Sequence, residues 1–405
     1  MRAYERLLKY VTYPTASDET SKSCPSTPEQ LELGRALVQE MKELGIADAA
    51  MDENGYVYGT VPGNVDKKVP VVGFIAHMDV VRDVPFDNIR ARVHHYDGGD
   101  IVLNEEQGIV MSPDEFPELK NYAGGDLIVT DGTTLLGADD KAGIAEIMTM
   151  AERLLRDPSI RHGDIKLGFT PDEEIGRGAD LFDIPRFGAD FAYTVDGAAF
   201  GAVEYENFNA ASCKVSIRGK NIHPGSSKNK MKNALLIAAE FSALLPPAET
   251  PAHTEMREGF YHLTSVEGVV EQAEMRYILR DHDSAVLEER KKTMQRAADF
   301  LNARYGEGTV TLTLTDGYRN MAEAMRDHMH IIETARSAVR ELGSEPQSNP
   351  IRGGTDGARL TYMGLICPNL GTGSHNHHGK LEYASVQAMD KCTDLLVKIA
   401  EAYAR

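Results

Sequence analysis

The alternation of short apolar strands with amphipathic helices is the feature that most constrains the fold of this chain. The segment Val69–Ala76 is almost continuously apolar, as expected for a central strand that is covered on both faces. An amphipathic helix pattern follows at Lys141–Leu155. Strands that alternate with helices favour an α/β domain with a mostly parallel, mixed sheet and flanking helices. The other segments with these patterns are the strands Gly55–Val61, Asp164–Phe169, Phe191–Val195 and Gly364–Leu370, and the last helix, Val386–Tyr403.

A helix is also predicted near the start of the chain, over Pro28–Leu44. Thr27 and Gln30 have the spacing of a capping box, in which two side chains satisfy free N–H groups of the first turn. Pro28 suits the first helical position, where no N–H is needed. By contrast, the acidic segment Asp87–Tyr122 is predicted to be an irregular surface excursion.

The pattern changes between residues 208 and 316. Four segments with alternating apolar and polar residues flank two long helix patterns, Asn233–Leu245 and Ser284–Tyr305. This order predicts a separate α+β domain inserted into the first one. We therefore expect residues 1–207 and 317–405 to form one discontinuous α/β domain, with the inserted domain at residues 208–316.

The charge of the chain excludes some classes of partner. Asp and Glu number 62 against 43 Lys and Arg, which gives a formal net charge of −19. Nucleic acids and anionic lipids are disfavoured as partners, because phosphate groups bind basic surfaces. No apolar run approaches the roughly 20 residues that span a bilayer, and no secretory leader is expected. The four scattered cysteines form no CxxC pair, which predicts reduced thiols in a cytoplasmic protein.

Histidine and carboxylate side chains follow several of the predicted strands. Open parallel sheets bind ligands at the carboxyl ends of their strands, so these loops are expected to converge. Each piece alone also has a plain structural explanation, such as an acidic helix cap, a hydrogen-bonded pair or a polar turn. The residues concerned are His77 and Asp79, Asp139 and Asp140, Glu173 and Glu174, Asp196, and His375, His377 and His378.

This inventory contains imidazoles and carboxylates but no thiolate. Nitrogen and oxygen ligands without sulfur fit a catalytic zinc, manganese or cobalt site better than a structural zinc site. There are enough of them for two ions that share one carboxylate, as in aminopeptidases, phosphatases and nucleases. Because an acidic protein is a poor nuclease, hydrolysis of a small peptide or amide is the favoured chemistry.

The chain resembles the peptidase T family of tripeptide aminopeptidases. This family belongs to the co-catalytic zinc exopeptidases, which also include aminoacylase-like enzymes and glutamate-releasing carboxypeptidases. The resemblance runs from YERLLKYVTYPTASDE near the N-terminus to the last helix. It is carried by HMDV (77–80), TDGTTLLGADDKAGIAEI (130–147), TPDEEIGRG (170–178), VDG (195–197), ENFNAASCKVSIRGKNIHPGSSK (206–228), IRGGTDGARLTYMGL (351–365) and NHHGKLEY (376–383).

The resemblance implies a metal-dependent aminopeptidase that releases the N-terminal residue of tripeptides. Residues 1–207 and 317–405 would be its catalytic, metal-binding domain, and residues 208–316 its inserted lid or dimerisation domain. His77 and Asp196 would bind one metal ion, and Glu174 and His378 would bind the second. Asp139 would bridge both ions, with a cis peptide bond after it. The implied cofactors are two divalent metal ions, with zinc as the first choice and cobalt or manganese as alternatives.

The resemblance also implies roles around the metals. Glu173 would be the general base, taking a proton from a bridging water or hydroxide and passing it to the leaving amine. Asp79 would hold His77 in its ligating tautomer. His223 resembles a residue that stabilises the oxyanion and that related dimeric enzymes contribute across an interface, so a homodimer is implied. The alternative for His223 is a polar turn before Pro224.

Three further residues are candidates for binding the carboxylate of the peptide substrate. They are Asn233, Arg280 and Arg352, of which the arginines suit bidentate capture of a carboxylate. Arg280 could equally be the ion-pair partner of Asp281 or Asp283.

The sequence departs from the family pattern in two places. Ala198 and Ala199 stand where glycines commonly follow VDG, and His377 stands where an aromatic residue often precedes the ligand histidine. His377 therefore competes with His378 as a ligand, and His375 could add to the surroundings of the site. A dipeptidase or aminoacylase-type amidohydrolase with the same metal site is the alternative function. A metal-dependent binding protein without catalysis is the alternative from another class.

Overall fold

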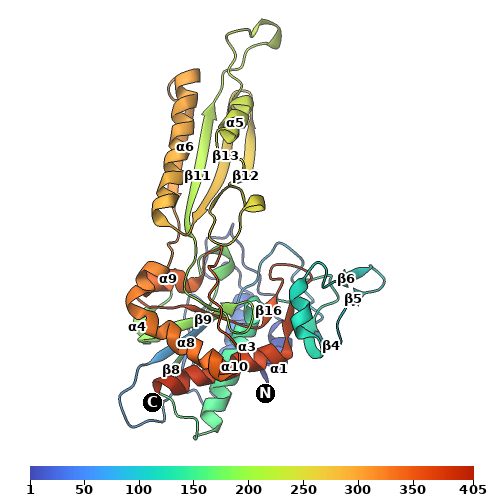
Figure 1. The fold of residues 1–405 in the computed structure, drawn as a ribbon, viewed down its shortest axis with the longest axis vertical. Helices are drawn as coiled ribbons and strands as arrows, with labels where there is room; N and C mark the ends of the chain where they lie inside the picture. The colour runs from blue at the N-terminus through green and yellow to red at the C-terminus, as the bar shows by residue number, and fades with distance from the viewer. The chain divides into compact units, whose positions relative to one another are not determined.

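The computed structural model describes all 405 residues, and they form two compact units (Figure 1). Unit 1 contains Met1–Tyr205, Ala324–Ser348 and Thr355–Arg405, and unit 2 contains Glu206–Glu323 and Asn349–Gly354. The inserted domain was expected to end at residue 316. Unit 2 instead continues to residue 323 and includes a second, short piece of chain at 349–354.

Unit 1 is built on a seven-stranded sheet with the order β1-β2-β8-β3-β9-β15-β10. The four strands β8, β3, β9 and β15 run parallel, and antiparallel pairs complete both edges. Every residue of β3 is buried, which explains its continuously apolar sequence. The predicted α/β fold with a mostly parallel, mixed sheet is confirmed. The strands are β1 (Ala50–Met51), β2 (Val57–Val61), β3 (Val72–His77), β8 (Ile165–Thr170), β9 (Phe191–Gly197), β10 (Val203–Glu204) and β15 (Asn369–Gly371).

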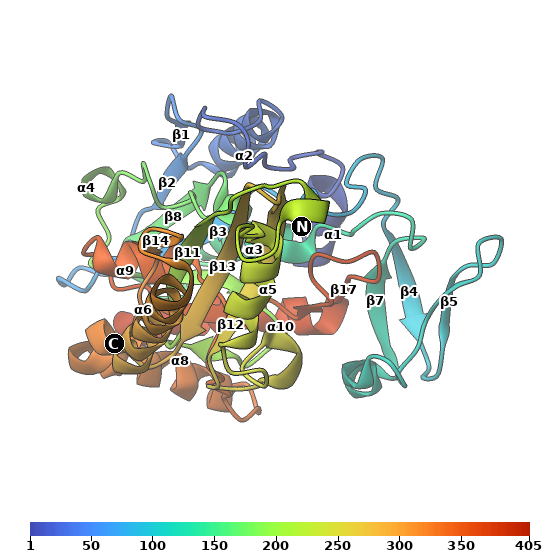
Figure 2. The same cartoon turned by 90° about the horizontal axis from the view of Figure 1, so that it is seen from above.

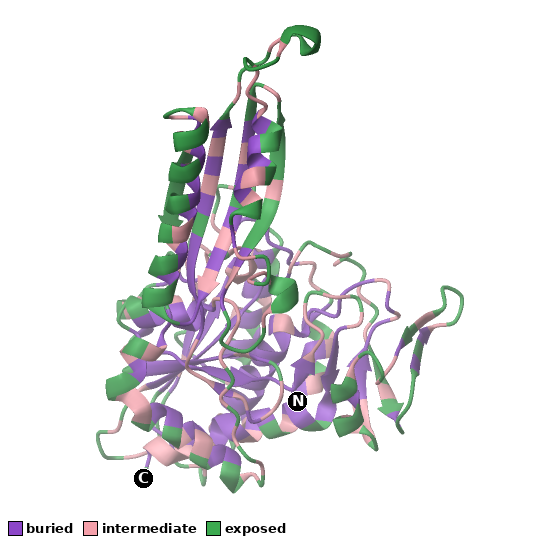
Figure 3. Cartoon of the chain, turned by 45° about the horizontal axis from the view of Figure 1, so that its top comes forward, coloured by how far each residue is buried: buried purple, intermediate pink, exposed green.

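Helix α3 (Ala138–Arg156) is the central helix of unit 1. It contacts β3 and β9 of the sheet as well as helices α1 and α10, and most of its residues are buried. Figure 3 shows buried residues concentrated in the interior of unit 1. Its backbone is not helical at Asp139 and Asp140, so the regular helix begins at Lys141, as the sequence predicts. The other helices of unit 1 are α1 (Ala3–Tyr10), α2 (Gln30–Leu44), α4 (Ile184–Phe187), α8 (Met329–Glu341), α9 (Asp356–Tyr362) and α10 (Val386–Tyr403).

The beginning of α2 differs from the prediction, because the capping box at Thr27 and Gln30 does not form. The helix begins at Gln30 rather than at Pro28, and no side chain caps it. The Thr27 hydroxyl donates to the carbonyl oxygen of Ala16 at 2.9 Å. Gln30 is completely buried, and its side chain reaches a distant segment of the chain instead.

A second, smaller sheet of unit 1 has the order β16-β17-β7-β4, and Figure 2 shows β4 and β7 beside the main sheet. The prediction of an irregular segment at 87–122 was wrong, because the segment contains short strands whose apolar residues fill a small core together with Leu127, Val129 and Tyr383. Ile101, Leu103, Met111 and Leu119 are all buried there. The elements are β4 (Arg92–Tyr96), β5 (Ile101–Asn104), β6 (Ile109–Met111), the 3-10 helix η1 (Pro117–Tyr122), β7 (Gly125–Val129), β16 (Ser374–His375) and β17 (Tyr383–Ser385).

Unit 2 contains a four-stranded antiparallel sheet with the order β12-β13-β11-β14. Side chains on one face of β11, such as Val215, share a core with Phe241 of α5 and Leu301 of α6. This packing explains why the two central strands, 209–218 and 272–281, largely alternate between buried and more exposed residues. The elements are β11 (Asn209–Arg218), α5 (Ala234–Ala243), β12 (Phe260–Val269), β13 (Gln272–Asp281), α6 (Ser284–Tyr305) and β14 (Val310–Asp316).

Two further observations bear on the sequence predictions. All four cysteines are free, and Cys213, Cys367 and Cys392 are buried. None of the helices combines the length and the apolar character that crossing a membrane requires.

Candidate metal centre

Three neighbouring parallel strands of unit 1 end at the same edge of the sheet, and each carries or precedes a polar side chain. Strand β3 ends at His77, and β9 contains Asp196 at its end. Strand β8 ends at Thr170 and is followed by a 3-10 turn, η2 (Glu173–Ile175). Because β3 pairs in parallel with both β8 and β9, these ends lie side by side.

Two groups of side chains there have the composition and spacing of metal sites. In the first, His77 Nε2 lies 3.0 Å from Asp139 Oδ1 and 3.4 Å from Asp196 Oδ1. In the second, His378 Nε2 lies 2.9 Å from Glu174 Oε2 and 3.2 Å from Asp139 Oδ2. Asp139 belongs to both groups and presents a different oxygen to each. The structure thus brings together all five residues that the resemblance implied as ligands.

The backbone before α3 places Asp139 at this position. Gly137 adopts the left-handed conformation (φ 78°), and the peptide bond between Asp139 and Asp140 is cis. The buried carboxylate of Glu382 accepts hydrogen bonds from the N–H groups of Leu136, Gly137 and Asp139 at 2.7–2.9 Å. The sequence analysis missed this role of Glu382, although the residue stands in the NHHGKLEY motif beside His378.

Asp79 fixes the orientation of His77. Nδ1 of His77 lies 3.1 Å from the main-chain oxygen of Asp79, which can only accept a hydrogen bond. Nδ1 therefore carries a proton, which leaves Nε2, the nitrogen that faces Asp139 and Asp196, as the one that can bind a cation. The Asp79 carboxylate in turn accepts the N–H groups of Glu173 and Glu174 at 2.9 and 3.1 Å. One buried side chain thus connects the histidine of the first group with the turn that carries Glu174.

The site holds more carboxylates than a buried site can ionise without cations. Burial raises the pKa of Asp196 to about 6 and that of Glu174 to about 7. Burial opposes ionisation of Asp139 too, but the three imidazoles His377, His378 and His77 hold its pKa well below the usual range. Glu174 also has a buried oxygen, Oε1, without any hydrogen-bond partner. Imidazole nitrogens and carboxylate oxygens of this kind fit two divalent cations that share Asp139.

The neighbouring histidines are arranged differently from His378. Nδ1 of His377 lies 3.4 Å from Asp139 Oδ2, but its Nε2 pairs with the Ser374 hydroxyl at 2.8 Å. His375 Nε2 pairs with the Tyr122 hydroxyl at 2.6 Å, and burial lowers the pKa of His375 to about 4. His378 alone among the three contacts both Asp139 and Glu174.

Glu173 lies next to Glu174 on the η2 turn. Burial raises the pKa of Glu173 well above its usual range, and the negative charge of nearby Asp196 adds to this effect. The two neighbouring carboxylates differ in their surroundings, because that of Glu174 pairs with His378 at 2.9 Å.

The remaining predicted residues all belong to unit 2. His223 is exposed, and its Nδ1 accepts a hydrogen bond from the N–H of Gly225 at 3.2 Å. Asn233 caps α5, because its side chain accepts the N–H of Leu235 at 3.0 Å. These contacts assign both side chains a local structural role in unit 2.

The two arginines of unit 2 also have partners within that unit. Arg280 donates to the main-chain oxygens of Leu279 and Ala211 at 3.0 and 3.4 Å. Asp281 pairs with Arg290 at 2.9 Å rather than with Arg280. Arg352 donates to three oxygens of the 254–258 loop at 2.8–3.0 Å.

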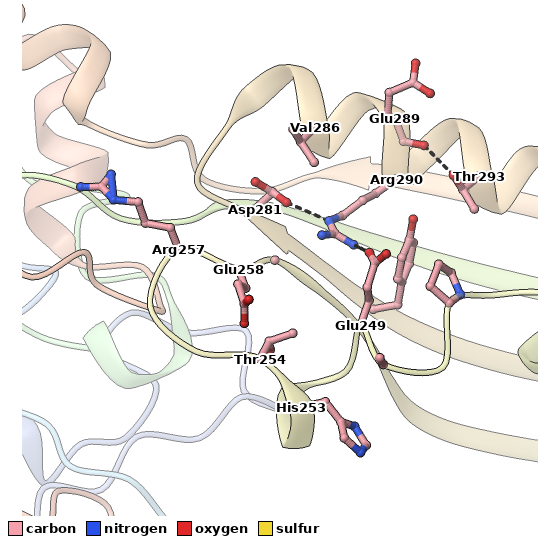
Figure 4. A pocket seen from close by; sticks show the side chains of 14 residues that line it. Glu249, His253, Thr254, Arg257, Glu258, Asp281, Val286, Glu289, Arg290 and Thr293 are labelled. Carbon is pink, nitrogen blue, oxygen red and sulfur yellow. Dashed lines mark hydrogen bonds and ion pairs between the residues drawn. The ribbon is translucent and has the colours of Figure 1, made fainter.

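A cavity of about 640 Å³ lies within unit 2 (Figure 4). Three of its charged side chains are paired with one another, since Arg290 bridges Asp281 and Glu249. None of the five predicted ligands lines this cavity. It is therefore not a second candidate for the hydrolytic chemistry.

Comparisons with known proteins agree with this geometry. Residues 131–402 match the sequence profile of Peptidase family M20/M25/M40. The chain is 57% identical over 404 residues to "Peptidase T" of Halothermothrix orenii, which covers 100% of this chain and 99% of that protein. It is 55% identical over 405 residues to "Peptidase T" of Caldanaerobacter subterraneus, again with 100% and 99% covered.

Solved structures share the fold at low sequence identity. The aminopeptidase PepT of Bacillus cereus has a TM-score of 0.78 at 24% identity, covering 100% of this chain and 98% of that one. A dinuclear metal-binding M20 peptidase of Bacillus subtilis has a TM-score of 0.65 at 14% identity, covering 99% and 97%.

Proposed function

The chain belongs to Peptidase family M20/M25/M40 and is a metal-dependent exopeptidase, and on this premise we propose that it removes the N-terminal residue from tripeptides. The observation that carries the proposal is the position of Asp139, with one oxygen beside His77 and the other beside His378. Relatives named "Peptidase T", more than 50% identical over the full length, support tripeptides as substrates.

We propose two zinc ions as the cofactors, with cobalt or manganese as replacements. His77 and Asp196 would hold one ion, Glu174 and His378 the other, and Asp139 both. When bound, the two cations lower the pKa of water and polarise the scissile carbonyl group.

The residues of the chain then have distinct tasks. Glu173 accepts the proton of the attacking water and delivers it to the leaving amine, for which its raised pKa is suited. Asp79 orients His77 so that Nε2 faces the metal site, and it holds the turn that carries Glu173. His223 would stabilise the oxyanion, and Asn233, Arg280 and Arg352 would bind the peptide carboxylate. In their present contacts these four residues serve unit 2, so their roles toward substrate depend on a change of partners.

We further propose that the enzyme is a cytoplasmic homodimer. Four free cysteines, three of them buried, suit a reducing compartment. The dimer follows from the resemblance to dimeric relatives of the same chemistry.

The sharpest test of the proposed chemistry is Glu173→Gln, which keeps the shape of the side chain but removes the base. Turnover of tripeptides should fall by about 10²–10⁴-fold, because this is what general acid–base catalysis contributes. The variant should still bind about two metal ions, measured by elemental analysis of the purified protein. Glu106→Gln, in an exposed turn of unit 1, is the matched control and should be fully active.

A substrate panel separates the proposed activity from its nearest rival. The wild-type enzyme should cleave tripeptides faster than dipeptides and N-acyl amino acids. Preferred cleavage of N-acyl substrates, in which the amine is blocked, would assign the same site to an aminoacylase-type amidohydrolase. Absence of any turnover with zinc, cobalt or manganese restored would leave a metal-dependent binding protein.

A further inference from the structure

The residue before the proposed base, Asp172, is held in an unusual place. It is completely buried, and its backbone is left-handed, with φ at 61°. A buried carboxylate is costly unless hydrogen bonds replace its lost water. The conformation of Asp172 decides how the chain enters the η2 turn, and Glu173 is the first residue of that turn.

The main partners of the Asp172 carboxylate come from a segment about 145 residues earlier in the chain. The N–H of Ser26 donates to it at 2.8 Å, and the Ser26 hydroxyl donates to it as well. Gln30 Nε2 donates to Asp172 Oδ1 at 2.8 Å. Gln30 Oε1 also accepts the N–H of Asp172 at 3.1 Å. Gln30 thus binds both the side chain and the backbone of the same residue.

The plain explanation for Gln30, a helix cap, does not account for these contacts. No side chain caps α2, and both polar atoms of the Gln30 amide are bonded to Asp172. Nε2 also lies 3.1 Å from the Thr27 hydroxyl, so the amide is held in one orientation. A buried amide with its donor and acceptor both used is a rigid contact rather than a mobile one.

The other side of the turn is fixed by different residues. Asp79 accepts the N–H groups of Glu173 and Glu174, and the Thr170 hydroxyl donates to the Asp356 carboxylate at 2.8 Å. Neither Asp79 nor Asp356 contacts Asp172 by a hydrogen bond. Arg177 adds a hydrogen bond from its N–H to the main-chain oxygen of Asp172 at 2.9 Å and an ion pair at 4.0 Å, but the hydrogen bonds to the Asp172 carboxylate come from Ser26 and Gln30.

We propose that Gln30 is a positioning residue for the hydrolytic reaction, which acts by holding Asp172 and thereby the backbone that carries Glu173. The inference rests on the proposed role of Glu173 as the base. A group that delivers a proton must stay within hydrogen-bond reach of it, so a small displacement of the turn reduces turnover more than substrate binding.

The first test is Gln30→Met, which keeps the volume of the side chain and removes both hydrogen bonds. We expect kcat for tripeptides to fall about 10–100-fold, as small misplacements of reacting groups do, with KM within about twofold of wild type. Gln39→Met is the matched control on the same helix, because Gln39 is exposed and bonds only to Glu43. Unchanged kcat in Gln30→Met would overturn the inference.

A readout that needs no activity is backbone hydrogen exchange of the metal-loaded enzyme. Exchange in the peptide covering residues 170–178 should accelerate in Gln30→Met and stay as in wild type in Gln39→Met. Acceleration throughout unit 1 would instead mean a general loss of stability and would contradict a positioning role.

A double-mutant cycle with Asp172→Asn shows whether Gln30 acts through Asp172. The double variant should lose no more kcat than the stronger single variant, whereas losses that multiply would contradict the inference. Failure of the proposed function gives a different result. In that case the wild type would not cleave tripeptides, or Glu173→Gln would remain active, while the exchange of residues 170–178 would still respond to Gln30→Met.

Discussion

At the scale of single residues, the metal centre depends on how Asp139 is presented. Its two oxygens face different histidines because the chain before α3 is held by three hydrogen bonds to Glu382. A carboxylate held by its own backbone in this way needs no reorganisation when cations arrive. Such support of a ligand by surrounding hydrogen bonds typically changes metal affinity 10–100-fold.

Replacing Asp139 by asparagine should therefore remove metal from both positions at once. The bound metal should fall from about two ions per chain to below one after dialysis, because the shared anionic ligand is lost. Elemental analysis of the purified variant measures this directly. Asp131→Asn is the control, since its carboxylate bonds Thr133 in a nearby loop. Two ions at full occupancy in Asp139→Asn would refute the bridging role.

The sequence pointed to the residues that the structure brings together at this site, but not to the residues that hold them in place. His77, Asp139 and Glu174 stand in long motifs, so the resemblance could identify each of them. Glu382 and Gln30 act on partners 142 or more residues away, and contacts over such separations leave no local pattern. The spacing of Thr27 and Gln30 instead suggested a capping box, which is a local motif. In the structure the amide of Gln30 bonds to the buried carboxylate of Asp172, and the capping box does not form.

At the scale of elements, one arginine joins three helices of unit 1. Arg6 of α1 donates to Glu40 of α2 at 2.8 Å and to Glu152 of α3 at 2.7 Å. It is only 2% exposed, and its removal takes away the cation that two largely buried carboxylates share, which leaves Lys9 beside Glu40 and the N-terminal amine beside Glu152. Breaking a buried ion pair from one side is costly, typically about 3–5 kcal/mol.

We expect Arg6→Met to lower the free energy of unfolding by about 3 kcal/mol at pH 7, measured by urea denaturation. Although burial opposes ionisation, hydrogen bonds from Lys9 and Arg6 lower the pKa of Glu40. A lowered pKa stabilises the fold above the unfolded value of about 4.3 and loses this effect as the pH falls further. The difference between variant and wild type should therefore shrink below about pH 4. Arg35→Met, exposed on α2, should stay within about 0.5 kcal/mol of wild type.

The elements themselves were predicted where periodicity was strong. Val69–Ala76 and Lys141–Leu155 correspond to β3 and α3, because continuous burial and amphipathic spacing leave clear signals. The segment 87–122 was misjudged, since its strands are short and its acidic residues dominate the composition. The predicted strand at 364–370 is shorter than expected, and β15 covers only Asn369–Gly371.

At the scale of the whole molecule, the proposed homodimer can be tested at one exposed strand of unit 2. Strand β12 is an edge strand of unit 2, and Val266 and Val269 on it are 48% and 59% exposed. An edge strand with exposed apolar side chains invites pairing with another chain. We expect the wild type to elute with the mass of two chains in light scattering, and Val266→Lys to shift it toward one.

The control for this experiment is Val93→Lys, because Val93 is 44% exposed but belongs to β4 of unit 1. It should leave the mass unchanged. A wild-type chain that stays monomeric at micromolar concentration would contradict the proposed dimer.

The two-unit organisation could be anticipated from the change of pattern near residue 208, but its details could not. Residues 349–354 belong to unit 2 because Ile351 contacts other residues of that unit. For example, Nε2 of His282 lies 3.1 Å from the main-chain oxygen of Ile351. So short a piece has no periodicity of its own. Its placement follows only from tertiary contacts, which a pattern in the sequence does not contain.

The position of β15 in the sheet limits the stage of protein synthesis at which the enzyme can become active. This strand lies between β9 and β10, although it is synthesised more than 160 residues after both. His378 and Glu382 follow it. While a ribosome is still translating these codons, the nascent polypeptide has neither a completed sheet nor its full set of ligands. Peptidase activity can therefore arise only after residues 369–382 have been synthesised, when most of unit 2 has already had time to fold.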